Sequence, residues 1–232
     1  MDSNAYVLRR GQLQQYFDRT AVKAWERLTS DAPVSRIRAT VRAGRDRMRA
    51  LMLDLLPQHL AGCRMLDAGC GTGAMSLELA ARGATVVAID LSPTLVGLAR
   101  ERSHAAKGEP IEFRVGDMRD AGLGAFEHVV AMDSLIHYQA DDIVRVLAAW
   151  APRTRRSIVF TFAPRTPALT VMHSIGRAFP RGDRAPAIAP VAEERLRTRL
   201  GCAPEFAGWS IGRSQRIASG FYTSHVMELV RR

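Results

Sequence analysis

The sequence predicts an α/β fold built on a doubly wound, mostly parallel sheet. From residue 63 onward, short apolar and β-branched stretches alternate with helical stretches, which is the pattern of successive β-α-β units. A glycine-rich turn follows the first of these strands, as it does in nucleotide-binding sheets. With 232 residues, the chain has the length of one domain with appendages and can form a core of its own.

The first 60 residues are expected to form a helical arm. Apolar residues recur at helical spacing before a break at Asp31-Ala32-Pro33. A longer amphipathic helix with an Arg-rich face follows, and Pro57 stops it. We therefore divide the chain into an N-terminal helical arm or cap, residues 1–60, and a sheet domain, residues 61–232.

Five strands and three helices are expected in the first part of the sheet domain. Ser92 suits an N-cap and Pro93 suits the first helical position, so the pair opens the second helix. The expected strands are residues 64–67, 85–89, 111–115, 125–132 and 157–162. The expected helices are residues 72–82, 94–103 and 141–150.

The alternation ends after Pro164. The pattern there predicts two helices, residues 169–179 and 191–200, with a proline-containing loop at 180–190 between them. Two further strands are expected at residues 206–214 and 220–230.

The turn Asp67–Gly73 is expected to hold a nucleoside ligand. Gly69, Gly71 and Gly73 permit backbone angles closed to other residues and let a ligand contact the main chain. The helix after the turn directs unpaired N–H groups at the same place. Cys70 lies inside this turn, where we interpret it as a small filler. The turn alone fits either a dinucleotide or S-adenosylmethionine.

Four acids are expected at the carboxyl ends of consecutive strands: Asp67, Asp90, Asp117 and Asp133. Ligands of open α/β sheets bind at this edge. Asp90 follows Gly69 by the interval expected for a carboxylate that binds ribose hydroxyls. Asp67 would repel a pyrophosphate but attract an ammonium group, and this favours S-adenosylmethionine.

Asp117 and Met118 supply an acceptor for the adenine amino group and an apolar contact for its ring. The predicted cofactor-binding residues are Asp67, Gly69, Cys70, Gly71, Gly73, Asp90, Leu91, Asp117, Met118 and Asp133.

Charge is unevenly distributed along the chain. Residues 1–60 carry 11 Lys and Arg against 6 Asp and Glu, residues 61–150 carry 8 against 12, and residues 151–232 carry 14 against 5. The basic flanks predict an anionic partner, with solvated surface arginine as the alternative. Three cysteines without paired spacing argue against a disulfide framework or a zinc site, so we expect a reducing cytoplasm. No apolar run reaches the length of a membrane span, and no secretory signal is expected.

Residues 63–162 resemble a class I S-adenosylmethionine-dependent methyltransferase, with Asp67–Gly73 as its first motif. The resemblance implies a Rossmann-like sheet that ends with an antiparallel C-terminal strand. The Asn/Asp-Pro-Pro-aromatic motif of amino-directed nucleic-acid methyltransferases does not follow the fourth strand, so no nucleic acid is expected as a partner.

Further motifs resemble the magnesium-protoporphyrin IX O-methyltransferases of bacteriochlorophyll and chlorophyll synthesis. The stretches that carry the resemblance are Tyr16-Phe17-Asp18 with Trp25 and Arg27, Ile136-His137-Tyr138, Phe162–Thr166, Ile175-Gly176 with Phe179-Pro180, and Phe221-Tyr222. The family implies S-adenosylmethionine-dependent methyl esterification of one propionate of magnesium-protoporphyrin IX, giving the monomethyl ester. Residues 164–200 would then be a lid insertion over the substrate.

The resemblance also implies site residues. We expect His137 to orient the carboxylate and Tyr16 to close over the sulfonium centre, with axial binding of magnesium by His137 as an alternative. Because a carboxylate is ionised at neutral pH, no strong general base is needed. Ile136, Tyr138 and Arg165 are the predicted substrate-binding residues, and no metal site in the protein is expected.

Two partners are implied by the family: the large subunit of magnesium chelatase and, by peripheral contact, the photosynthetic membrane. Two alternatives stay open at this point. One is a class I O-methyltransferase of another small anionic or phenolic substrate. The other is a nucleic-acid-binding protein with a methyltransferase fold, which Arg without interleaved aromatics disfavours.

Overall fold

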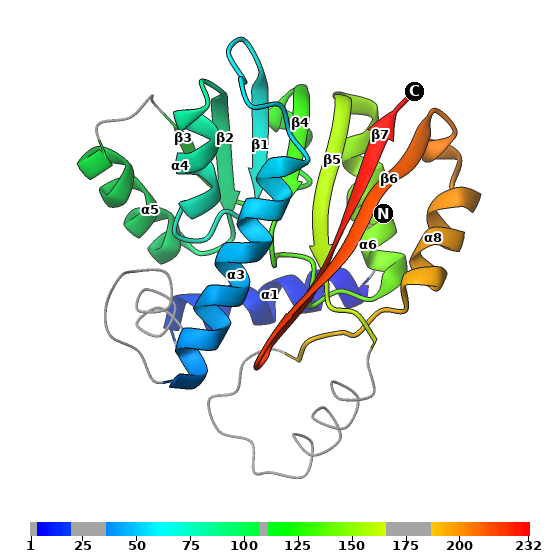
Figure 1. Cartoon of the computed structure of the whole chain (residues 1–232), viewed down its shortest axis with the longest axis horizontal. Helices are drawn as coiled ribbons and strands as arrows, with labels where there is room; N and C mark the ends of the chain where they lie inside the picture. The colour runs from blue at the N-terminus through cyan, green and yellow to red at the C-terminus, as the bar shows by residue number, and fades with distance from the viewer. Residues whose placement is uncertain (1–3, 20–35, 107–110, 166–186) are drawn as a thin grey trace.

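A computed structural model describes residues 4–19, 36–106, 111–165 and 187–232. Its centre is a seven-stranded sheet of order β3-β2-β1-β4-β5-β7-β6 (Figure 1). The first five strands are parallel: β1 (Arg64–Ala68), β2 (Thr85–Asp90), β3 (Glu112–Val115), β4 (Phe126–Ala131) and β5 (Thr154–Phe162). β7 (Tyr222–Arg231) is antiparallel to both β5 and β6 (Trp209–Ser219). The predicted fold class is confirmed.

Helices cover both faces of the sheet, and one further helix lies across the carboxyl ends of its parallel strands. α3 (Arg36–Asp54), α4 (Ala74–Ala81) and α5 (Pro93–Ala106) belong to one layer. α6 (Ala140–Trp150) and α8 (Glu193–Cys202) belong to the other. α1 (Asn4–Arg19) crosses beyond the carboxyl ends of the parallel strands (Figure 1). The edge where ligands bind in such sheets is therefore the edge that α1 covers.

Alternation along the strands produces two separate cores. In β1, Met65 packs in the core that contains Met52 of α3 and Leu79 of α4. The next residue, Leu66, packs in the core that contains Trp150 of α6. Successive side chains of a strand point to opposite faces, so a strand covered on both sides must be apolar at nearly every position.

Several element boundaries differ from those predicted. α4 begins at Ala74 rather than Thr72, because Gly73 adopts a left-handed conformation with φ of 81°. β6 begins at Trp209, because a short 3-10 turn occupies Pro204–Phe206. β5 starts earlier than predicted, at Thr154, which pairs with the first residue of β4. The helix predicted at 169–179 lies outside the described residues.

α3 packs tightly against the β6–β7 hairpin. A Cβ atom on Gly44 of α3 would lie 2.6 Å from Cδ1 of Tyr222, and one on Gly220 would lie 2.5 Å from Oγ1 of Thr40. Met48 and Met52 of the same helix are buried in the core with β1. The domain division at residue 60 stays a prediction, and α3 shares its core with the sheet.

The Gly44 contact leads to a paired prediction on stability. Ala in a helix interior normally gains about 0.5–1 kcal/mol over Gly, and Gly97→Ala in α5 should follow this rule because nothing lies within 4 Å of its added Cβ. Gly44→Ala should instead lose about 1–3 kcal/mol, since overpacking forces α3 and Tyr222 apart. Thermal denaturation would measure both. A gain from Gly44→Ala would show that α3 does not press on the hairpin.

Candidate active site

The glycine turn is held by bonds to the end of β2. The Gly69 and Cys70 N–H groups donate to the Ile89 carbonyl at 2.8 and 3.0 Å, and the Gly71 N–H donates to Oδ2 of Asp90 at 2.9 Å. Gly69, Gly71 and Gly73 all have left-handed φ values of 54–81°. The predicted need for glycine at these three positions is confirmed, because a side chain is sterically disfavoured there.

Gly69 is needed for a second reason, which is close approach to the turn after β4. A Cβ atom on Gly69 would lie 2.3 Å from Cβ of Ser134, closer than two carbon atoms can approach. The hydroxyl of Ser134 is buried and has no hydrogen-bond partner among the described residues. A buried hydroxyl without a partner is costly, so this position suits a ligand that supplies a polar atom.

Asp67 lies inside the protein between the turn and α4. Its Oδ2 accepts a hydrogen bond of 2.5 Å from the Ser76 hydroxyl, and its side chain is 1% exposed. Burial is the main cause that raises the pKa of Asp67, to about 7, and the charge of Asp90 adds to it. A cation bound at the turn would favour the ionised form.

Asp90 stands where a ribose acid is expected. Its Oδ2 accepts from Gly71 N–H and its Oδ1 from Ser92 N–H, both at 2.9 Å. A carboxylate offers about four acceptor positions, so these two bonds leave capacity for ribose hydroxyls. Asp18 of α1 reaches the same place and accepts a bond of 2.5 Å from the Ser92 hydroxyl. Burial raises the pKa of Asp90.

Asp117, the predicted adenine acid, is bound by α1. Tyr6 Oη donates to its Oδ1 at 3.0 Å, and Arg10 Nη1 lies 2.8 Å from its Oδ2. Burial alone would raise the pKa of Asp117, but bonds from the Arg119 N–H, Arg10 and Tyr6 hold it below its usual value. The carboxylate is therefore ionised and able to accept a further donor.

The remaining cofactor predictions fall on buried or half-buried groups. Met118 is buried, and its carbonyl accepts a bond from Trp150 Nε1 at 2.8 Å. Leu91 is half-buried beside the same core. Cys70 is buried, and desolvation raises the pKa of its thiol well above the usual value, so the thiol is neutral. This agrees with the interpretation of Cys70 as a filler.

α1 connects the two predicted catalytic residues through Phe17. The ring of Tyr16 packs edge-on against Phe17, with centroids 5.3 Å apart, and Phe17 packs edge-on against His137 at 6.2 Å. His137 is buried, and its Nδ1 lies 3.4 Å from the Ala187 carbonyl oxygen. Burial raises the pKa of Tyr16, so it stays a neutral phenol.

The predicted substrate residues differ in exposure: Tyr138 is buried, whereas Arg165 is exposed. Tyr138 is 2% exposed and stacks on Tyr6 with centroids 5.3 Å apart, beneath α1. The Ile136 carbonyl accepts a bond of 2.8 Å from the Ala189 N–H. Arg165 is exposed, and its N–H donates to the Val191 carbonyl at 2.9 Å. Their roles toward a substrate stay predictions.

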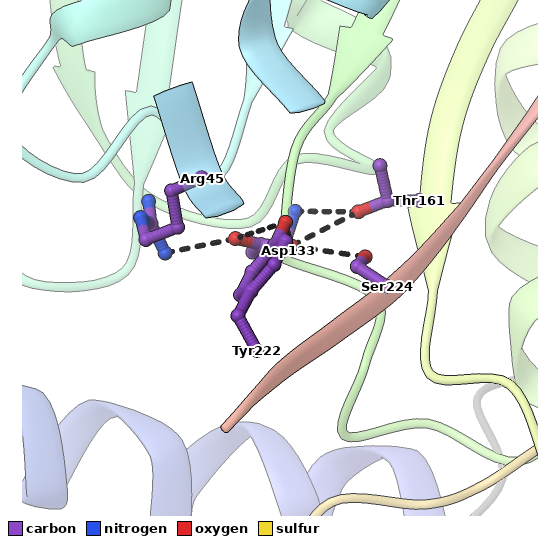
Figure 2. A network of polar contacts seen from close by, with 5 residues as sticks. All are labelled: Arg45, Asp133, Thr161, Tyr222 and Ser224. Atoms are coloured by element: carbon purple, nitrogen blue, oxygen red, sulfur yellow. Dashed lines mark hydrogen bonds and ion pairs between the residues drawn. The ribbon is translucent and has the colours of Figure 1, made fainter. Parts of the chain in front are cut away.

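Asp133 lies at the centre of a buried network instead of at an open strand end (Figure 2). Its carboxylate accepts hydrogen bonds from Arg45 Nη1 at 2.8 Å, Tyr222 Oη at 3.0 Å and Ser224 Oγ at 3.3 Å. These donors come from α3 and β7. Its contact with a cofactor stays a prediction, because the structure gives the carboxylate these donors from the protein itself.

Sequence reasoning did not anticipate the partners of these acids. The unexpected partners are Tyr6, Arg10, Arg45, Ser76, Tyr222 and Ser224. Only Ser76 stood close enough in the sequence to be found, since it lies on the first turns of the helix after Asp67. The others depend on contacts between distant segments.

The raised pKa of Asp67 predicts pH-dependent cofactor binding. Below about pH 7 the ligand-free carboxyl is largely protonated, and binding a cation must displace that proton. Affinity for S-adenosylmethionine should therefore rise with pH by up to about tenfold per unit and level off near neutrality. Calorimetric titration between about pH 5.5 and 7.5, below the pKa at which the ligand ammonium loses its proton, measures this. Asp67→Asn should flatten the profile; an unchanged slope would assign it to another group.

Comparison with known proteins agrees with this arrangement. Residues 131–231 match the family described as magnesium-protoporphyrin IX methyltransferase C-terminus, and residues 65–156 match a methyltransferase domain. The magnesium-protoporphyrin O-methyltransferase of Rhodobacter capsulatus is 49% identical over 224 residues, which cover 96% of this chain and 97% of that protein. The chloroplastic magnesium protoporphyrin IX methyltransferase of Arabidopsis thaliana is 29% identical over 94% of this chain and 70% of its own length.

A solved structure extends the similarity to three dimensions. The crystal structure of magnesium protoporphyrin IX methyltransferase from Synechocystis PCC 6803 with bound SAH aligns with a TM-score of 0.81 and 30% identity, covering 96% of this chain and 100% of that chain. The chain belongs to the magnesium-protoporphyrin O-methyltransferase family.

Proposed function

We propose that this protein transfers the methyl group of S-adenosylmethionine to a propionate carboxylate of magnesium-protoporphyrin IX, giving the monomethyl ester. The observation that carries the proposal is that Phe17 of α1 packs on His137, with Tyr16 against Phe17, beyond the carboxyl ends of the strands where the glycine turn lies. Membership of the family supports the choice of substrate.

The residues present fit S-adenosylmethionine. Asp90 would take the ribose hydroxyls, Asp117 the adenine amino group, and Asp67 the positive charge of the methionine part. When bound, this cofactor supplies a methyl group activated by a sulfonium. Since the adenine amino group is a donor, it would join or replace Tyr6 and Arg10 at Asp117.

The remaining task of the protein is orientation. The attacking propionate oxygen is already ionised at neutral pH, so the barrier is lowered mainly by alignment and by exclusion of water. A proton on Nδ1 of His137, donated toward Ala187, makes Nε2 the acceptor of the neutral ring, whereas the imidazolium donates from both nitrogens. We assign His137 to orient the carboxylate by a hydrogen bond from Nε2, which requires a proton on that nitrogen. Tyr16 is separated from His137 by the ring of Phe17, and we propose that it closes the site over the sulfonium centre.

The rim around this edge suits a large apolar substrate and its delivery. The exposed large apolar residues of the described part of the chain are Val7 and Leu8 of α1, Val115 at the end of β3, Ile188 next to the partner of Ile136, and Phe221 directly before β7. The exposed Arg165 and Arg216 lie at the same end of β5 and β6. We propose that Arg165 meets the second propionate. None of the described helices could span a membrane.

We also propose that this rim meets the large subunit of magnesium chelatase or a membrane surface. Apolar side chains next to arginines suit either contact, because both can present an apolar surface next to acidic groups. The same rim would then receive the porphyrin from its donor without a passage through water.

The activity is tested with purified protein, magnesium-protoporphyrin IX and methyl-labelled S-adenosylmethionine. We expect one labelled methyl ester per porphyrin, detected by chromatography of the extracted pigment. Protein that binds SAH normally but forms no labelled ester would redirect the proposal to another small anionic or phenolic substrate.

The site assignment is tested by His137→Ala. Turnover should fall about 10²-fold, as for loss of a group that orients a reactant, while SAH affinity stays close to wild type. Tyr16→Phe, which keeps the ring, should have a smaller effect than Tyr16→Ala. Equal losses of SAH affinity and turnover in His137→Ala would place this residue at the cofactor instead of the carboxylate.

A further inference from the structure

Asp133 combines three features that its position at a strand end does not require. It is the only non-glycine residue of the described chain with positive φ, 53°. Its side chain is 3% exposed, and it forms an ion pair with Arg45. Left-handed backbone and a buried charge are both unfavourable unless the surroundings enforce them, and such enforced conformations concentrate at functional sites.

The surroundings of Asp133 do enforce its conformation. The Thr161 hydroxyl of β5 accepts a bond of 2.7 Å from the Asp133 N–H and lies 3.4 Å from its Oδ1. Tyr222 Oη reaches both carboxylate oxygens, at 3.0 and 3.3 Å, and Ser224 Oγ reaches Oδ1 at 3.3 Å. Arg45 approaches Oδ2 from α3. Figure 2 shows these side chains converging on Asp133 from separate elements.

The turn that contains His137 begins directly after Asp133. Ser134, the first residue of this turn, is the one that lies against Gly69. The Leu135 carbonyl accepts a hydrogen bond from the Tyr138 N–H at 3.1 Å, which closes the turn around His137. The backbone angles of Asp133 therefore set the direction in which this turn leaves β4.

We propose that Asp133 is a positioning residue, held by Arg45, Tyr222 and Ser224 so that the turn 134–138 presents His137 to the substrate. The proposal rests on the proposed function, because it assigns a role in the same methyl transfer. It differs from the cofactor contact predicted for Asp133, since the network bonds no residue of the glycine turn. It also gives α3 and the C-terminal hairpin a part in catalysis.

The test removes one oxygen atom from the network. Tyr222→Phe keeps the ring that packs on Gly44 and deletes only the hydroxyl that binds Asp133. Ser157→Ala is the matched control, because it too deletes one buried hydroxyl. This hydroxyl lies on β5 and contacts His128 at 2.7 Å. Each variant is measured for SAH affinity by calorimetry, for melting temperature, and for turnover per SAH-binding site.

If the proposal is correct, Tyr222→Phe lowers turnover per SAH-binding site about 10- to 100-fold, the cost of a small misplacement of a reacting group, with SAH affinity near wild type. Ser157→Ala leaves turnover per site unchanged. In a His137→Ala background, Tyr222→Phe has no additional effect, because the group that it positions is gone. Asp133→Asn, which tolerates positive φ, gives a loss of turnover like that of Tyr222→Phe.

Three results overturn the proposal. Unchanged turnover per site in Tyr222→Phe, with only a lower melting temperature, makes the network purely structural. A parallel loss of SAH affinity makes Asp133 a cofactor-binding residue. Full additivity with His137→Ala means that the network acts elsewhere. Absence of ester formation by the wild-type protein is a separate result, which contradicts the proposed function and not the network.

Discussion

The buried charge of Asp133 is the constraint that joins the separate parts of this molecule. A carboxylate removed from water must be met by donors, and three of the donors here come from α3 and β7. α3 can reach it only because Gly44 lets the helix lie against Tyr222. The bonds to Asp133 therefore hold the β6–β7 hairpin, α3 and the turn after β4 together.

A similar logic applies to the acids along the ligand-binding edge. Asp90 accepts bonds from backbone N–H groups, and Asp117 from Tyr6 and Arg10, and both keep acceptor capacity for a ligand. These are the same kinds of donor that ribose hydroxyls and an adenine amino group provide. A site whose carboxylates are already ordered needs little reorganisation when such donors arrive, and α1 is the element that orders Asp117.

The uneven charge of the chain has an internal explanation as well as an external one. In the described part of the chain, ion pairs between the basic first 60 residues and the acidic centre include Arg10 with Asp117 and Arg45 with Asp133. Part of the arginine excess of the arm therefore balances the strand-end acids. Arginines of the C-terminal part, such as Arg216, are exposed instead.

The sequence by itself determined the parallel sheet, the place of the glycine turn and the acid at the end of β2. These depend on local signals: strand and helix periodicity, glycines in the turn after the first strand, and Asp90 at the interval from Gly69 that is expected for a ribose acid. Only the tertiary structure decided what surrounds the other acids. Tyr6 stands 111 residues from Asp117, and Arg45 stands 88 residues from Asp133. A pairing between such distant side chains is specified by how helices pack on the sheet, and no local pattern in the sequence records it.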